Sequence, residues 1–178
     1  EAQAREAQIE AALERVRSSA LAMHQSDDLR ISLAKLFEEL DKFQLGMIRC
    51  GIAILDPLHP RGDVWIMSKS TGNHTIQLSG DEPLDTNTTM LEAYGAWKKG
   101  KDYEEILEGE KLYEYYQSLG QIKFQSELSS SFTREITSQR QHYFNAAFKH
   151  GSLFAFFEDE MTDFGKTILK RFSKCKTK

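Results

Sequence analysis

Alternation of apolar and other residues at a period of two is the feature that most constrains the fold of this chain. Every second residue from Ile48 to Ile54 is apolar or Cys, which predicts a strand over Met47–Leu55 with one well-buried face. The same period recurs over residues 64–68 and 74–78, and each neighbouring pair is separated by a turn-forming segment. We therefore expect an antiparallel meander of three strands.

A second group of strands is expected near the C-terminus. Residues 141–149 and 153–157 are separated by His150-Gly151-Ser152, a pattern typical of a hairpin. Helical or mixed patterns precede and separate the two groups: helices at 26–40, 88–98 and 110–119, a short strand at 103–107, a polar loop at 80–87, an ambiguous segment at 122–140 and a final helix after the N-cap Thr162. This order predicts an α+β fold with an antiparallel sheet flanked by helices.

The N-terminal segment, Ala2 to His24, has the pattern of an amphipathic helix with a coiled-coil seam. Apolar residues recur at spacings of three and four, and a shorter series continues in the C-terminal helix. Two interpretations stay open from this pattern: a helix that dimerises and passes a signal along the chain, or a helix that packs on its own domain. The first predicts a homodimer interface formed by Ile9, Leu13, Val16, Ala20, Met23, Ile168 and Phe172.

Composition narrows the class of protein. The chain has 178 residues, 40% of them hydrophobic and 28% charged, and its net charge is −4. These values are those of a globular protein without a global attraction to nucleic acid or to an anionic membrane. The sequence has neither an apolar run of membrane-spanning length nor a signal peptide pattern, and its two cysteines make no disulfide framework, so we expect a cytoplasmic location. Because the sequence begins with Glu1 inside a helical pattern, we expect a domain of a larger polypeptide.

No constellation typical of catalysis is visible in the sequence. The five histidines are scattered, and the chain has no phosphate-binding glycine loop, nucleophile elbow or kinase motif set. We expect His142 and His150 to be surface or hydrogen-bonded residues and Cys50 to be a small buried hydrophobe. The sequence therefore predicts neither an enzyme nor a metal site, and it identifies no cofactor.

Aromatic residues with polar tips are the candidates for a ligand site. They come from the strands and from the segment between the third and fourth strands, where they have either of two roles, core packing or the lining of a pocket. Core packing is the favoured interpretation, because the aromatic content of 11% is ordinary. The pocket interpretation predicts ligand contacts by Trp65, Tyr94, Trp97, Tyr103 and Tyr116.

Several blocks of the sequence resemble one family. Residues 6–17 (EAQIEAALERVR) followed by 22–29 (AMHQSDDL) are similar to the linker and opening helix of GAF-like sensor domains, which lie upstream of histidine kinase and related output domains in bacterial signalling proteins. Residues 49–54, 96–101 and 168–172 resemble further blocks of that family in the same order. The likeness therefore extends over nearly the whole chain.

The resemblance implies a GAF-like, PAS-related fold, with a central antiparallel sheet, helices on one side and a pocket on the other. It implies a linker helix at 1–25, a sensor domain at 26–160 and an exit helix at 161–178. The expected function is a sensory or signal-relay module that dimerises through its linkers and binds an unidentified small molecule. A dimerisation or spacer module without a ligand is the alternative, since a shared fold does not transmit a site.

Overall fold

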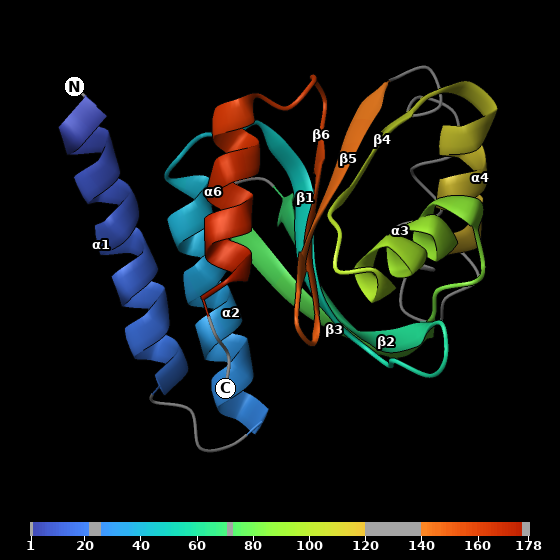
Figure 1. Ribbon diagram of the computed structural model, residues 1–178, viewed down its shortest axis with the longest axis horizontal. Coiled ribbons are helices and arrows are strands. Elements are labelled where there is room, and N and C mark those ends of the chain that lie inside the picture. Colours follow the sequence, from blue (N-terminus) through green and yellow to red (C-terminus); the bar gives the residue numbers. More distant parts are fainter. Residues whose placement is uncertain (1, 22–25, 71–72, 120–139, 176–178) are drawn as a thin grey trace. The chain divides into compact units, whose positions relative to one another are not determined.

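The structure is a computed structural model that describes residues 2–21, 26–70, 73–119 and 140–175. In these ranges the chain has an α+β fold, with five helices and one six-stranded antiparallel sheet (Figure 1). It forms two compact units. We call Glu1–Leu45 with Thr162–Lys178 the helical unit and Gly46–Met161 the sheet unit, and each is described by itself.

The sheet has the strand order β3-β2-β1-β6-β5-β4 (Figure 1). Every neighbouring pair is antiparallel. Its strands are β1 (Met47–Leu55), β2 (Arg61–Ser70), β3 (Asn73–Pro83), β4 (Tyr103–Leu107), β5 (Gln141–Phe148) and β6 (Gly151–Phe157). The expected meander and hairpin are confirmed, and pairing of β1 with β6 joins the two groups into one sheet.

The strands differ from the sequence prediction in length and burial. β2 begins at Arg61, and β3 continues to Pro83 through residues that were expected to form a polar loop. The two extensions pair with each other, and the Arg61 guanidinium donates to the Asp81 carboxylate at 2.8 Å. Because both side chains are exposed, no apolar alternation marks these strand ends. β1 is buried on both faces from Arg49 to Ala53, whereas one buried face was expected.

Two helices belong to the sheet unit, α3 (Thr88–Lys98) and α4 (Gly109–Leu119). Asn87 caps α3 by accepting a hydrogen bond from the backbone N–H of Met90 at 2.8 Å. The buried stripe of α4 contains Leu112 and Tyr115, while Tyr113 is exposed. Leu91 of α3 is likewise exposed. Neighbouring apolar residues in these helices leave the direction of the buried stripe ambiguous.

Side chains from both helices and from alternate strand positions form the core of the sheet unit. These residues share one face of the sheet, because side chains at every second position of a strand point the same way. The core includes Ala53, Leu55, Val64, Ile66, Ala93, Tyr94, Leu107, Leu112, Tyr115, Tyr143, Phe154 and Phe156. The sheet and the helices α3 and α4 therefore enclose one apolar layer.

The helical unit contains α1 (Ala2–Leu21), α2 (Ser26–Asp41) and α6 (Asp163–Ser173). α6 begins at the predicted N-cap, where the Thr162 hydroxyl accepts from the backbone N–H of Gly165 at 3.1 Å. α1 packs against both α2 and α6. Its contact with α6 is reinforced by Arg171, which pairs with Glu6 at 2.7 Å and with Glu10.

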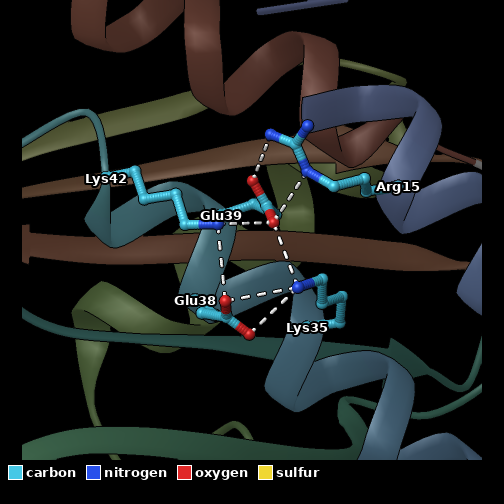
Figure 2. Close-up of polar contacts among 5 residues, drawn as sticks. All are labelled: Arg15, Lys35, Glu38, Glu39 and Lys42. Carbon is cyan, nitrogen blue, oxygen red and sulfur yellow. Dashed lines mark hydrogen bonds and ion pairs between the residues drawn. The ribbon is translucent and has the colours of Figure 1, made fainter. Parts of the chain in front are cut away.

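A buried carboxylate joins α1 to α2 (Figure 2). The Glu39 side chain on α2 has no exposed surface, and its two oxygens accept hydrogen bonds from Arg15 on α1 at 3.0 and 2.8 Å. Lys35 and Lys42 approach the same carboxylate at 3.2 and 2.8 Å. The hydrogen bonds from Arg15 are the main cause that lowers the pKa of Glu39 to about 2, and those from the two lysines add to the effect.

The residues expected at a dimer interface are buried within the single chain where the structure describes them. Ile9, Leu13 and Val16 are at most 5% exposed, and Ile168 and Phe172 at most 2%. The other two expected residues, the side chain of Ala20 and the whole of Met23, lie outside the described residues, as does most of the segment 122–140.

In the described ranges, no helix is both long enough and apolar enough to cross a membrane.

Candidate functional site

The sheet unit contains a cavity of about 60 Å³ beside its apolar core. Residues of β1, β2, β3, β5 and β6 line it on the sheet side, and residues of α3 and α4 line it on the helix side. Most of the wall is apolar. The lining residues are Arg49, Ala53, Leu55, Val64, Ile66, Glu82, Leu84, Met90, Ala93, Tyr94, Tyr115, Tyr143, Asn145, Ser152 and Phe154.

Arg49 is the cation in this lining. It lies near the start of β1 on the same face as Ala53, and only 8% of its surface is exposed. Its guanidinium carbon is 4.4 Å from the centre of the Phe156 ring, and the rings of Tyr115 and Tyr116 lie at 5.7 and 5.6 Å. Aromatic rings on several sides therefore hold the guanidinium at the cavity.

The guanidinium makes few hydrogen bonds for a buried arginine. Within the described residues its bond is from Nη2 to the Tyr115 hydroxyl at 3.2 Å, and its buried Nε has no partner. An arginine side chain carries five N–H donors in a planar fork. The contacts present thus leave donors for which the described residues supply no acceptor.

No carboxylate of the described residues forms an ion pair with Arg49. The neighbouring phenols do not supply a negative charge, because burial raises the pKa of Tyr115 to about 12 and also raises that of Tyr143. A guanidinium stays protonated in proteins. The cavity therefore contains a positive charge that the described side chains do not neutralise.

The energies of these contacts explain how a buried cation with no countercharge among the described residues is tolerated. A buried ion costs several kcal/mol of lost hydration. Each aromatic ring returns about 0.5–2 kcal/mol, and a hydrogen bond to a charged group about 1.5–3 kcal/mol. The rings around Arg49 and its bond to Tyr115 offset a cost of that order, so the residue is stable in place.

The acidic lining residue, Glu82, lies at the opposite end of the cavity. It pairs with Gly62, and Gly62 pairs with Leu55. Leu55 is six positions beyond Arg49 on β1, a separation of about 20 Å at the usual rise of a strand. The two residues are therefore too far apart along the sheet to pair.

Tyr94 is the one of the five expected aromatic residues that lines this cavity. Its hydroxyl donates to the backbone carbonyl of Asp56 at 2.8 Å. Trp65 alternates with Val64 and Ile66, which face the cavity, so its side chain leaves the opposite face of the sheet.

The other three expected residues pack against the core without lining the cavity. Each uses its polar tip in a hydrogen bond: Trp97 donates to the carbonyl of Phe148 at 2.9 Å, Tyr103 to Glu105 at 2.8 Å, and Tyr116 to the Gln141 side chain at 2.7 Å. For these residues the structure has the packing arrangement that was favoured from composition.

Arg49, Tyr115 and Tyr143 are the site residues that the sequence reasoning missed. Alternation assigned Arg49 to the exposed face of a half-buried strand, and the helical pattern at 110–119 did not single out Tyr115. The sequence contains one signal that could have identified Arg49. Arg49 is the single charged residue in the otherwise uncharged segment Met47–Leu55, and a lone charge in a central strand indicates either an exposed face or a buried functional group.

Other candidate groups in the described residues have structural partners. His142 is buried, with Nδ1 accepting from the backbone N–H of Met161 at 2.8 Å and Nε2 lying 3.3 Å from Glu104, as expected for a hydrogen-bonded histidine. Cys50 is buried, as predicted. Across the described ranges, no group of three or more His, Cys, Asp or Glu residues is placed to hold a metal ion.

Comparison of the chain with protein-family models, with curated proteins and with solved structures found no match.

Proposed function

We propose that this chain is a sensory module of the GAF-like type, which binds a small molecule in the cavity of the sheet unit and relays binding to its helices. The observation that carries the proposal is the cavity itself: an apolar space with the buried Arg49 at one end, to which the described side chains supply no countercharge. Ligand sites in proteins combine apolar walls with a few placed polar groups in this way.

The six-stranded antiparallel sheet supports the proposal, because the sequence resemblance implies a central antiparallel sheet. The helices α3 and α4 cover one face of this sheet, and the cavity lies between the sheet and these two helices. A fold of this kind supports many functions, so the proposal depends on the site rather than on the fold.

The path of the chain suggests how binding is relayed. α2 leads directly into β1, and β6 leads directly into α6, while β1 and β6 are neighbours in the sheet. Arg49 is two residues from the start of β1, and its stacking partner Phe156 is one residue from the end of β6. A ligand that moves the Arg49 side chain therefore acts close to both chain segments that lead to the helical unit.

A homodimer through α1 is the more specific part of the proposal. It would require α1 to leave α2 and α6, because Ile9, Leu13 and Val16 are already buried within one chain. Such an exchange is a two-state element of the kind that a ligand can bias. The ion pair between Arg15 and Glu39 opposes it.

A cavity-filling variant tests the binding proposal. We would screen a small-fragment library by ligand-observed NMR against the full chain and against Ala93→Leu, which extends a lining side chain into the cavity. The matched control is Ala96→Leu, on the same helix but outside the lining. We expect fragments that bind the parent chain and Ala96→Leu but not Ala93→Leu.

Hydrogen exchange tests the relay. A bound fragment should change the exchange of peptides from α2 and α6 as well as those from β1 and β6. If no fragment binds in an Ala93-dependent way, the sheet unit acts as a ligand-free spacer. If fragments bind without any change in the helices, the binding proposal stands and the relay is wrong.

A further inference from the structure

We propose that the ligand of the cavity is a short aliphatic monocarboxylate, whose carboxylate is bound by the Arg49 guanidinium and whose hydrocarbon chain occupies the apolar part. This inference rests on the proposed function, because it names the ligand class of the same cavity. It is carried by the juxtaposition of one buried cation with an otherwise largely apolar lining.

The positive charge of Arg49 at one end of the cavity favours an anionic ligand. The described residues give the Arg49 guanidinium one hydrogen bond, from Nη2 to Tyr115, so further N–H groups of its two terminal nitrogens have no acceptor among the described residues. A carboxylate matches the planar donor fork of arginine with two parallel hydrogen bonds. The Tyr115 hydroxyl, already 3.2 Å from the guanidinium, would lie beside such a carboxylate as a neutral donor.

The charge of the lining favours a monoanion. Arg49 is the one Lys or Arg among the lining residues that the structure describes, and Asn145 and Ser152 add only neutral polar groups. A phosphate dianion would keep an unpaired charge in the cavity at a desolvation cost. A dicarboxylate would likewise bring a second charge for which the described lining has no second cation.

The wall and the volume define the rest of the molecule. Beyond Arg49 the lining is formed by aliphatic and aromatic side chains such as Ala53, Val64 and Phe154. A space of about 60 Å³ corresponds to roughly four to six water-sized positions. Acetate, propionate and butyrate have heavy-atom counts in that range, so the expected ligands are alkanoates with short chains.

Isosteric pairs separate the carboxylate from the hydrocarbon contribution. We would titrate the full chain with acetate, propionate and butyrate and with the corresponding neutral amides, using ligand-observed NMR and calorimetry. We expect at least one carboxylate to bind about tenfold more tightly than its amide, because only the carboxylate forms charge-assisted bonds to Arg49. Inorganic phosphate and succinate are included as anions of the wrong charge and should bind more weakly than butyrate.

Variants of the cation locate the binding. Arg49→Met should abolish the preference for carboxylate over amide, and Arg49→Lys should retain part of it, since lysine keeps the charge without the planar fork. Arg61→Met is the matched control, because Arg61 belongs to the same sheet but is exposed and paired with Asp81. Circular dichroism and tryptophan fluorescence verify folding, and the comparison of ligands on the parent chain decides the question if Arg49→Met does not fold.

The outcomes distinguish this inference from the proposed function. If amides bind as tightly as carboxylates, or if phosphate or succinate binds more tightly than butyrate, the monocarboxylate inference is wrong. The proposal that the cavity binds a ligand then still stands. If carboxylate binding persists in Arg49→Met, the anion binds elsewhere and the monocarboxylate inference is also wrong. If no compound in this series binds but fragments bind in the Ala93-dependent test, the ligand class is wrong, and if neither binds, the proposed function fails as well.

Discussion

Arg15 on α1 donates to both carboxylate oxygens of Glu39 on α2, at 3.0 and 2.8 Å, and the Glu39 side chain is completely buried. The arginine itself keeps 46% of its side chain exposed. This polar contact, with one buried and one hydrated partner, joins the two helices at a specific pair of residues. It fixes the position of α1 along α2.

Glu39→Gln should destabilise the helical unit. The substitution keeps the side-chain shape but removes the charge that Arg15, Lys35 and Lys42 neutralise. We expect the free energy of unfolding to fall by about 2–3 kcal/mol, the usual effect of losing buried hydrogen bonds to charged groups. Urea unfolding followed by the helical circular dichroism signal measures the loss.

Glu38→Gln is the matched control for that substitution. Glu38 is the preceding residue of α2 and also pairs with Lys35 and Lys42, but 55% of its side chain is exposed. Exposed pairs contribute about 0–1 kcal/mol. Equal effects of the two substitutions would show that burial of the Glu39 carboxylate has no special energetic role.

Acid should remove the contribution of Glu39. Hydrogen bonds from Arg15 are the main cause that lowers its pKa from 4.5 to about 2 in the folded chain. A lowered folded pKa gives stability that is fully present above the unfolded value and is lost as the pH falls toward the folded value. The difference in unfolding free energy between the parent chain and Glu39→Gln should therefore be constant near neutral pH and shrink between about pH 5 and pH 2. A difference that stays constant down to pH 2 contradicts this assignment.

Period and capping signals predicted the elements well, because they report local backbone physics. The Thr162 cap and the alternation in β1 both depend on residues within one turn or one strand. Apolar alternation failed at the Arg61 and Asp81 ends of β2 and β3, where strand pairing involves exposed charged residues. There the hydrogen bonds of the sheet, rather than burial, determine the strand.

The spacing of apolar residues in a sequence does not specify whether the same chain or a second copy covers the face that they form. Leu13 and Val16 repeat as in a coiled coil, but a stripe at this spacing specifies only that one face is covered, and here residues of the same chain cover it. Arg49 illustrates the same limit, since alternation cannot distinguish an exposed face from a second buried face. The cavity and its cation depend on long-range packing of β1 against β6 and α4.

Gly51→Ala should destabilise the sheet unit. A Cβ at position 51 would lie 2.3 Å from the Phe154 ring and 2.5 Å from the backbone oxygen of Trp65, so rotation of the ring alone cannot make room. Overpacking of this kind costs about 1–3 kcal/mol. Both tryptophans of the chain, Trp65 and Trp97, belong to the sheet unit, so urea unfolding followed by tryptophan fluorescence reports this change.

Gly95→Ala, in the same unit, should not lower the stability as Gly51→Ala does. No atom lies within 4 Å of a Cβ built at Gly95, which is inside α3. Alanine is a better helix former than glycine by about 1 kcal/mol, so the substitution should leave stability unchanged or raise it. A loss as large as that of Gly51→Ala would mean that close packing at Gly51 is not the cause of its effect.

Leu13→Ala tests whether α1 is held by its own chain or by a second copy. Leu13 is 2% exposed in the single chain, so its truncation should lower the unfolding free energy of the helical unit by about 2–5 kcal/mol. Ile31→Ala on α2 is the control, because Ile31 is 65% exposed and surface truncations cost about 0.5 kcal/mol or less.

The decisive measurement is how the unfolding midpoint depends on protein concentration. With intrachain packing the unfolding midpoint is the same at low and high protein concentration, whereas a dimer through α1 becomes more stable as concentration rises. A midpoint that rises with concentration in the parent chain and not in Leu13→Ala would place α1 in an interface between copies.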